Sequence, residues 1–144
     1  MLLVALVSSS WAADANARIV KVLHQLVDAE GRVALAPSLF ERDAYQVHLR
    51  ENPELIAGSR FEIQYKASRK GGPVRLRMEV RGSKTCLGNA HIFEGEHLPS
   101  RWGKSWARIE LDRATSDALG TIIAWRATLW RGDVQLAEQE SFLW

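Results

Sequence analysis

The sequence has few of the residues that build covalent or metal-based scaffolds. Only one of its 144 residues is a cysteine, Cys86. A single thiol cannot form an internal disulfide, and no cysteine–histidine cluster has the spacing of a structural zinc site. On a continuous strand His91 and His97 would lie roughly 20 Å apart, too far to share one ion, and only a tight turn at residues 94–95 could bring them together. We therefore predict no metal and no cofactor, and a fold that depends on packing alone.

Long apolar runs are also missing. The N-terminal run, residues 1–7, is too short to cross a bilayer as a helix, which needs about 20 apolar residues. Small residues follow it, and Ser10 with Ala12, or Ala13 with Ala15, have the spacing of a signal-peptidase site. We predict a signal peptide over residues 1–15, its start truncated, and one exported domain over 16–144 without a transmembrane segment. The alternative is a first buried strand or helix.

The chain lacks a charge excess and any local catalytic motif. Lys and Arg number 19 against 17 Asp and Glu, a net charge of +2, which argues against a nucleic-acid partner. No nucleophile elbow, P-loop or dinucleotide-binding glycine pattern occurs, so we predict no catalytic residue. With 47% hydrophobic and 25% charged residues, the composition is that of a globular domain.

The clearest pattern is an alternation of apolar and polar residues. It holds throughout residues 61–67 and 74–81, which predicts two strands with one buried and one wet face. The polar loop between them contains two glycines, so we expect these strands to form a hairpin. Weaker patterns predict further strands, and a short helical turn is expected at 112–119. The further strands cover residues 18–27, 33–35, 90–93, 106–111, 121–130 and 134–144.

One helix is expected, over residues 38–52. Ser38 is a good N-cap, Glu41 has the capping-box spacing, and Pro53 ends the helix. Leu39, Phe40, Tyr45 and Leu49 are expected near one face of it. The predicted fold class is all-β, an antiparallel two-sheet immunoglobulin-like sandwich with one short helix insertion.

Two segments carry a resemblance to a known family. Residues 53–58, followed by a Phe/Ile/Tyr strand and a basic strand, resemble strands B and C of immunoglobulin- or fibronectin-III-like domains. Residues 111–114 look like the E–F corner of such domains. The closing run, residues 124–144, is similar to small exported bacterial proteins of uncharacterised function. The resemblance implies a sandwich and no activity.

A basic stripe is expected on the wet face of one sheet. Arg75, Arg77 and Arg81 share a side of their strand, and Lys66 is expected to join them from a neighbouring strand. Such charges can simply keep a face soluble and discourage edge pairing. The functional interpretation is contact with an anionic surface such as an acidic polysaccharide.

Six tryptophans are many for so short a chain. Trp102 and Trp106 stand in a loop beside Arg and Lys, a composition typical of interaction surfaces and of sugar-stacking platforms. Trp125 and Trp130 are five apart on one strand and must face opposite sides, so one is expected in the core and the other exposed or covered by the helix. Trp144 is expected to plug the core.

These patterns predict a non-catalytic binding or structural module of the bacterial envelope or secretome, periplasmic or extracellular. The first prediction for its partner is an envelope protein or a secreted protein. The second is a carbohydrate- or polyanion-binding module that uses Lys66, Arg75, Arg77, Arg81, Trp102, Trp106 and Trp130 as candidate contacts. The third is a small hydrolase with an unrecognised site.

Overall fold

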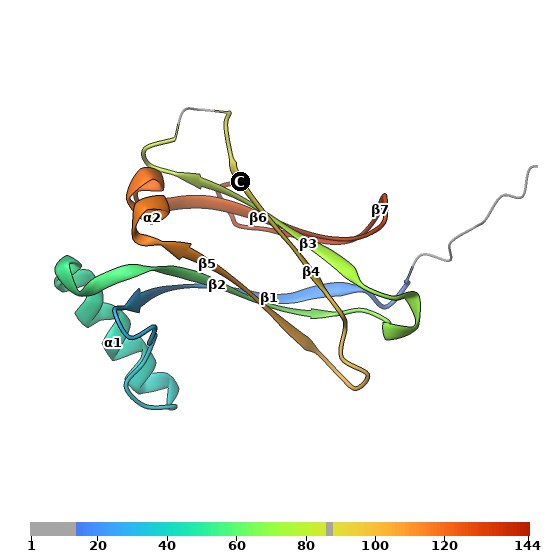
Figure 1. The fold of residues 1–144 in the computed structure, drawn as a ribbon, viewed down its shortest axis with the longest axis horizontal. Coiled ribbons are helices and arrows are strands. Elements are labelled where there is room, and N and C mark those ends of the chain that lie inside the picture. The colour runs from blue at the N-terminus through green and yellow to red at the C-terminus, as the bar shows by residue number, and fades with distance from the viewer. Residues whose placement is uncertain (1–13, 86–87) are drawn as a thin grey trace, which may run out of the picture.

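The computed structural model describes residues 14–85 and 88–144, which form two antiparallel sheets packed face to face (Figure 1). Residues 1–13 of the predicted signal peptide, and Cys86, lie outside the described residues. One sheet has the strand order β1 (Arg18–Asp28), β2 (Ile56–Lys66), β5 (Ser105–Asp112). The other has the order β4 (His91–His97), β3 (Val74–Gly82), β6 (Ile122–Arg131), β7 (Val134–Glu140).

The strand order confirms the predicted fold class. If the strands are lettered A to G in chain order, the sheets are A-B-E and D-C-F-G, a Greek-key sandwich of the immunoglobulin-like kind. Two short helices accompany them rather than one. They are α1 (Leu39–Glu51) and α2 (Arg113–Leu119), and single 3₁₀ turns cover Pro53–Leu55 and Arg69–Gly71. Among the described residues, no helix is both long and apolar enough to cross a membrane.

The predicted hairpin between β2 and β3 is wrong. β2 pairs with β1 and β5, whereas β3 pairs with β4 and β6, so residues 67–73 carry the chain from one sheet to the other. Alternation reports that each strand has one buried face, but it says nothing about which strand lies beside it. Lys66 therefore belongs to a different sheet from Arg75, Arg77 and Arg81, and it does not join their stripe.

The core lies between the two inner faces, where the alternation places it. β2 contributes Phe61, Ile63 and Tyr65, and β3 contributes Leu76 and Met78, all fully buried. Burying a side chain of this size stabilises the fold by about 1.5–3 kcal/mol relative to exposure. These two strands therefore anchor the sandwich, one from each sheet.

The predicted strand over residues 33–35 is not formed. After β1 the chain makes a compact turn in which the Asp28 carboxylate accepts hydrogen bonds from the backbone N–H of Glu30 (3.0 Å) and of Arg32 (2.8 Å). Gly31 supports the turn with a φ of 77°. The Val33 carbonyl then accepts a hydrogen bond from the side chain of Gln46, so its partner is a helix rather than a strand.

Helix α1 begins as predicted, because Ser38 Oγ accepts a hydrogen bond from the Glu41 N–H at 3.1 Å. Its predicted apolar face is only partly correct. Leu49 is fully buried, but Leu39 and Phe40 are 66% and 80% exposed. Polar contacts hold this helix against β1 instead. Gln46 Oε1 accepts a hydrogen bond from the Leu26 N–H at 2.7 Å, and Gln46 Nε2 donates one to the Leu26 carbonyl at 2.9 Å, as a neighbouring strand would.

The last strand ends earlier than predicted, at Glu140. Ser141 exchanges hydrogen bonds with the backbone of Trp125, and the chain then leaves the ladder. Trp144 does not plug the core. Its ring lies on the outer face of the four-stranded sheet, 3.9 Å from the guanidinium carbon of Arg81 and 4.9 Å from that of Arg126.

Candidate functional site

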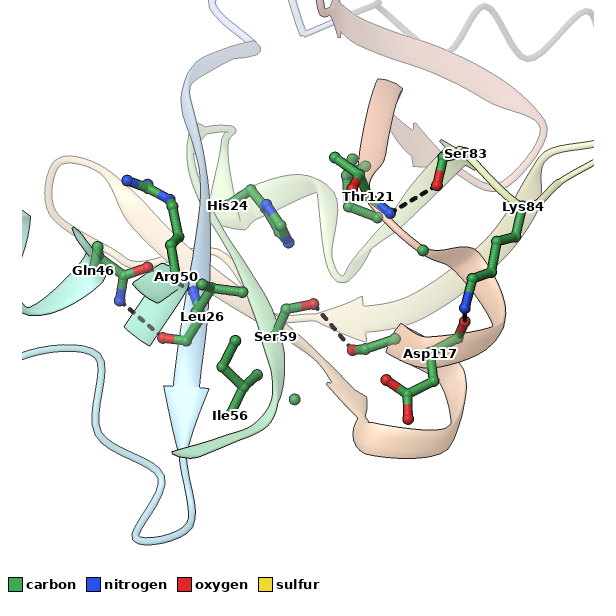
Figure 2. Close-up of a pocket in the computed structure, with 14 residues that line it drawn as sticks. His24, Leu26, Gln46, Arg50, Ile56, Ser59, Ser83, Lys84, Asp117 and Thr121 are labelled. Atoms are coloured by element: carbon green, nitrogen blue, oxygen red, sulfur yellow. Dashed lines mark hydrogen bonds between the residues drawn. The ribbon is translucent and has the colours of Figure 1, made fainter. Parts of the chain in front are cut away.

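A cleft of about 620 Å³ lies between the two sheets at the helical end of the sandwich. We call it the inter-sheet cleft. Figure 2 shows His24, Ile56 and Ser59 on one side of it and Ser83, Lys84, Asp117 and Thr121 on the other. Leu26, Gln46, Arg50, Gly58, Ser116, Gly120 and Ile122 complete the lining.

The cleft exists because β2 carries small residues where it reaches this end. Further along the strand, inward positions hold Phe61 and Ile63, but here Ser59 takes the equivalent position beside Leu26 and Leu111. Gly58 precedes it, and any side chain there would collide with the Leu111 carbonyl. The core filling therefore stops, and the space between the sheets opens to solvent.

Hydroxyl groups and one ammonium line the polar part of the cleft. Ser59 Oγ and Ser116 Oγ lie 3.3 Å apart, joining β2 to α2. Ser83 Oγ accepts a hydrogen bond from the Thr121 N–H at 3.0 Å. Lys84 Nζ donates to the Asp117 carbonyl at 2.9 Å and so closes the C-terminal turn of α2. These contacts hold the walls together and leave hydroxyl lone pairs free for a ligand.

His24 is held uncharged at the wall of the cleft. Its ring packs against Phe61 with 4.7 Å between ring centroids, although the residue as a whole is exposed to solvent. Surrounding protein atoms disfavour the charged form, and the nearby Arg50 guanidinium adds repulsion, so the pKa of His24 falls to about 4. Within the described residues no hydrogen bond joins His24 to a serine, so this geometry does not form a nucleophile–base pair.

The basic stripe lies on the outer face of the four-stranded sheet, as predicted for Arg75, Arg77 and Arg81. Acidic and aromatic neighbours accompany it, however. Arg77 lies 3.6 Å from Glu79 and 3.8 Å from Glu94, and Glu79 also receives Arg126 at 2.8 Å. Arg81 is stacked on Trp144. Arg77 is therefore paired with carboxylates within the protein, whereas Arg81 is covered by an aromatic ring.

Trp130 is on this outer face, and Trp125 faces inward against the core, so the two rings take opposite sides as predicted. Trp130 Nε1 donates to Thr128 Oγ1 at 2.9 Å, and the Arg75 guanidinium carbon is 5.8 Å from its ring. Trp130 is thus half-buried and hydrogen-bonded in place.

Trp102 and Trp106 are both exposed, at 83% and 52%. Trp106 belongs to β5 and stands opposite Gln64 on the outer face of the three-stranded sheet. Trp102 lies in the β4–β5 loop. Ser100 Oγ accepts a hydrogen bond from the Trp102 N–H and donates one to the Trp102 carbonyl, so the loop backbone is held in place while the indole ring is exposed to solvent. Only Trp102 therefore stands in the predicted loop, whereas Trp106 belongs to the strand that follows it.

The structure gathers a set of cations that sequence reasoning treated as separate. Lys66, Arg69, Lys70 and Arg101 line a hollow of about 320 Å³ at the end of the sandwich opposite the helices. We call these four residues the cationic loop end. None of the four has an ion-pair partner among the described residues. Trp102 lies between Arg101 and Gly103, both of which line the hollow.

One carboxylate, that of Asp14, also lines this hollow, and it is already engaged. It accepts a hydrogen bond from the Ser68 N–H and lies 3.7 Å from Arg131 Nη1. The cationic loop end therefore keeps an excess of positive charge. Both loops are visibly basic in the sequence. They come together only because β2 pairs with β5, which places the residues after β2 beside those before β5.

His91 and His97 stand at the two ends of the continuous strand β4. Across the ranges that the structure describes, no group of three or more His, Cys, Asp or Glu side chains is placed to hold a metal ion.

Comparison of the chain with family models, with curated proteins and with solved structures gives no match.

Proposed function

We propose that this protein is an exported, non-catalytic binding module that holds an acidic polysaccharide at the cationic loop end. The observation that carries the proposal is the convergence of Lys66, Arg69, Lys70 and Arg101 around one hollow without acidic partners. A polyanion would satisfy these charges together, because each cation otherwise pairs only with solvent.

The exposed ring of Trp102 supports a carbohydrate rather than a simple salt. Aromatic faces stack on the apolar faces of sugar rings, and an indole that is 83% exposed can do so without moving the backbone. Ser100 holds that backbone in place on both sides of the ring. The arrangement thus offers stacking and charge within one surface.

The test is a titration of the protein with polygalacturonate, followed by tryptophan fluorescence and by calorimetry at low salt and at about 0.5 M salt. The triple reversal K66E/R69E/K70E is expected to abolish binding at low salt. Lys21→Glu is the matched control, because Lys21 is an exposed cation on another part of the three-stranded sheet. Equal loss in both variants, or binding that survives the triple reversal, would refute the proposed site.

Arg75→Glu separates this proposal from the basic-stripe interpretation. Arg75 lies on the outer face of the other sheet, against Trp130, and outside the hollow. Its reversal is expected to leave polygalacturonate binding unchanged. A loss at Arg75 equal to that of the triple variant would return the binding site to the stripe.

A protein partner is the second candidate, and a different surface supports it. Helix α1 turns Leu39, Phe40 and Val47 toward solvent, and an exposed apolar stripe of this kind is typical of a protein contact. The test is capture of one stoichiometric protein from an envelope extract by the wild type but not by Phe40→Asp. Capture by both proteins would argue against this surface.

A further inference from the structure

The inter-sheet cleft has the size and shape of a small-molecule site. Its volume of about 620 Å³ falls within the range of about 300–1,000 Å³ usual for ligand pockets. It lies at the helical end, away from the cationic loop end, and the two concavities share no lining residue. A ligand here would therefore be independent of the polysaccharide proposed above.

One part of the cleft is apolar. Leu26, Ile56 and Ile122 come from β1, β2 and β6 and contribute side chains that are only partly covered by the protein. These three residues lie where the core would continue if Ser59 were larger. A hydrocarbon body placed against them would recover the burial that the core loses at this end.

The charge balance of the cleft is positive. Arg50 lines it and has no ion-pair partner within the described ranges, while Lys84 is bonded to a carbonyl rather than to a carboxylate. The single acid of the lining, Asp117, lies 3.2 Å from Arg113 and is neutralised by it. Because His24 is uncharged near neutral pH, Arg50 and Lys84 remain as the two groups that can receive an anion.

We propose that the inter-sheet cleft binds a small amphipathic carboxylate, with its hydrocarbon body against Leu26, Ile56 and Ile122. Its carboxylate is held by Arg50 or Lys84. The hydroxyls of Ser59 and Ser116 are engaged with each other and with the Leu111 carbonyl, so the two cations are the groups that hold the head group. A neutral molecule of the same shape would gain the apolar contacts but not the charge-assisted hydrogen bonds.

Octanoate is the probe, and 1-octanol is its uncharged counterpart. In an amide chemical-shift titration of the whole chain, octanoate is expected to perturb residues around the cleft and to bind more tightly than octanol. The double variant R50Q/K84Q is expected to weaken octanoate about tenfold, the loss of one charge-assisted hydrogen bond, and to leave octanol unchanged. Both side chains are exposed and the variant removes only one hydrogen bond, from Lys84 to the Asp117 carbonyl, so it is expected to keep the fold.

Ser59→Leu provides a second, steric test, since it fills the cleft and should abolish binding of both probes. The K66E/R69E/K70E protein is expected to bind octanoate like the wild type, which separates this proposal from the one above. Perturbations confined to Leu39 and Phe40 of α1, or equal affinity of R50Q/K84Q and wild type for octanoate, would overturn the proposal.

Discussion

The two ends of the sandwich use polar residues in opposite ways. At the helical end, polar side chains are buried and hydrogen-bonded: Asp28 and Gln46 tie the turn after β1 and helix α1 to the sheet. At the opposite end, Lys66, Arg69, Lys70 and Arg101 are exposed and lack acidic partners among the described residues. Stability therefore depends on polar groups at the helical end, while the opposite end is free to present charge.

The largest expected effect is the loss of the Asp28 carboxylate. It accepts hydrogen bonds from two backbone N–H groups, from Arg32 Nε at 2.9 Å and from the Tyr45 hydroxyl. Asp28→Ala is expected to lower the free energy of unfolding by about 3 kcal/mol, because four hydrogen bonds around a buried carboxylate are lost together. Urea denaturation at neutral pH measures the change.

Asp133→Ala is the control at the opposite end. Asp133 is exposed in the β6–β7 turn, and its substitution is expected to change stability by less than about 0.5 kcal/mol. If the two substitutions lowered the free energy of unfolding by similar amounts, the inferred difference between the two ends would be wrong.

The second prediction concerns the loss of stability in acid, to which His24 and Asp28 contribute over different pH ranges. Burial alone would raise the pKa of Asp28, but hydrogen bonds from Tyr45 and Arg32 lower it from 3.8 to about 2. The stability that Asp28 contributes is therefore lost as pH falls from about 3.8 to 2. The folded protein resists protonation of His24, whose pKa falls from 6.5 to about 4, so stability already declines as pH falls through that window.

His24→Gln is expected to flatten the decline of the urea midpoint between pH 6.5 and 4, while leaving the loss below pH 3.8 in place. The slopes are compared within each protein, because the substitution also removes the contact with Phe61. An unchanged slope in the variant would show that another group governs this window.

The smallest effect on stability is expected at the loop end. Trp102 is 83% exposed, and Trp102→Ala should change the free energy of unfolding by no more than about 0.5 kcal/mol, although polygalacturonate binding weakens. A large loss of stability would mean that the ring holds the β4–β5 loop, and the two ends would then differ less than we infer.

Much of the secondary structure could be predicted because alternation is a local property. The inward residues Phe61, Ile63 and Tyr65 follow directly from it, and Ser38 with Glu41 marks the start of α1. Pairing could not be predicted, since nothing in residues 67–73 states that β3 enters the other sheet. That error placed Lys66 beside Arg75 and concealed its meeting with Arg101.

The inter-sheet cleft was beyond prediction for a similar reason. It is produced by small residues on separate elements, such as Ser59 on β2 and Ser116 on α2, which meet only in the folded chain. The contacts of Arg77 and Arg81 could not be predicted either. Their partners, Glu94 and Trp144, come from β4 and from the segment after β7. Family membership stays a prediction from the sequence.

The crossing of the chain between β2 and β3 has a consequence for how fast the protein folds. β2 and β3 each pair with a strand that is distant in the sequence. Gly58 of β2 pairs with Asp112 of β5, and Gly82 of β3 pairs with Ile122 of β6. Each pairing closes a long loop before any contact compensates for the lost chain entropy, so we expect refolding in milliseconds to seconds rather than microseconds. Until those loops close, the apolar faces of both sheets remain open to other chains.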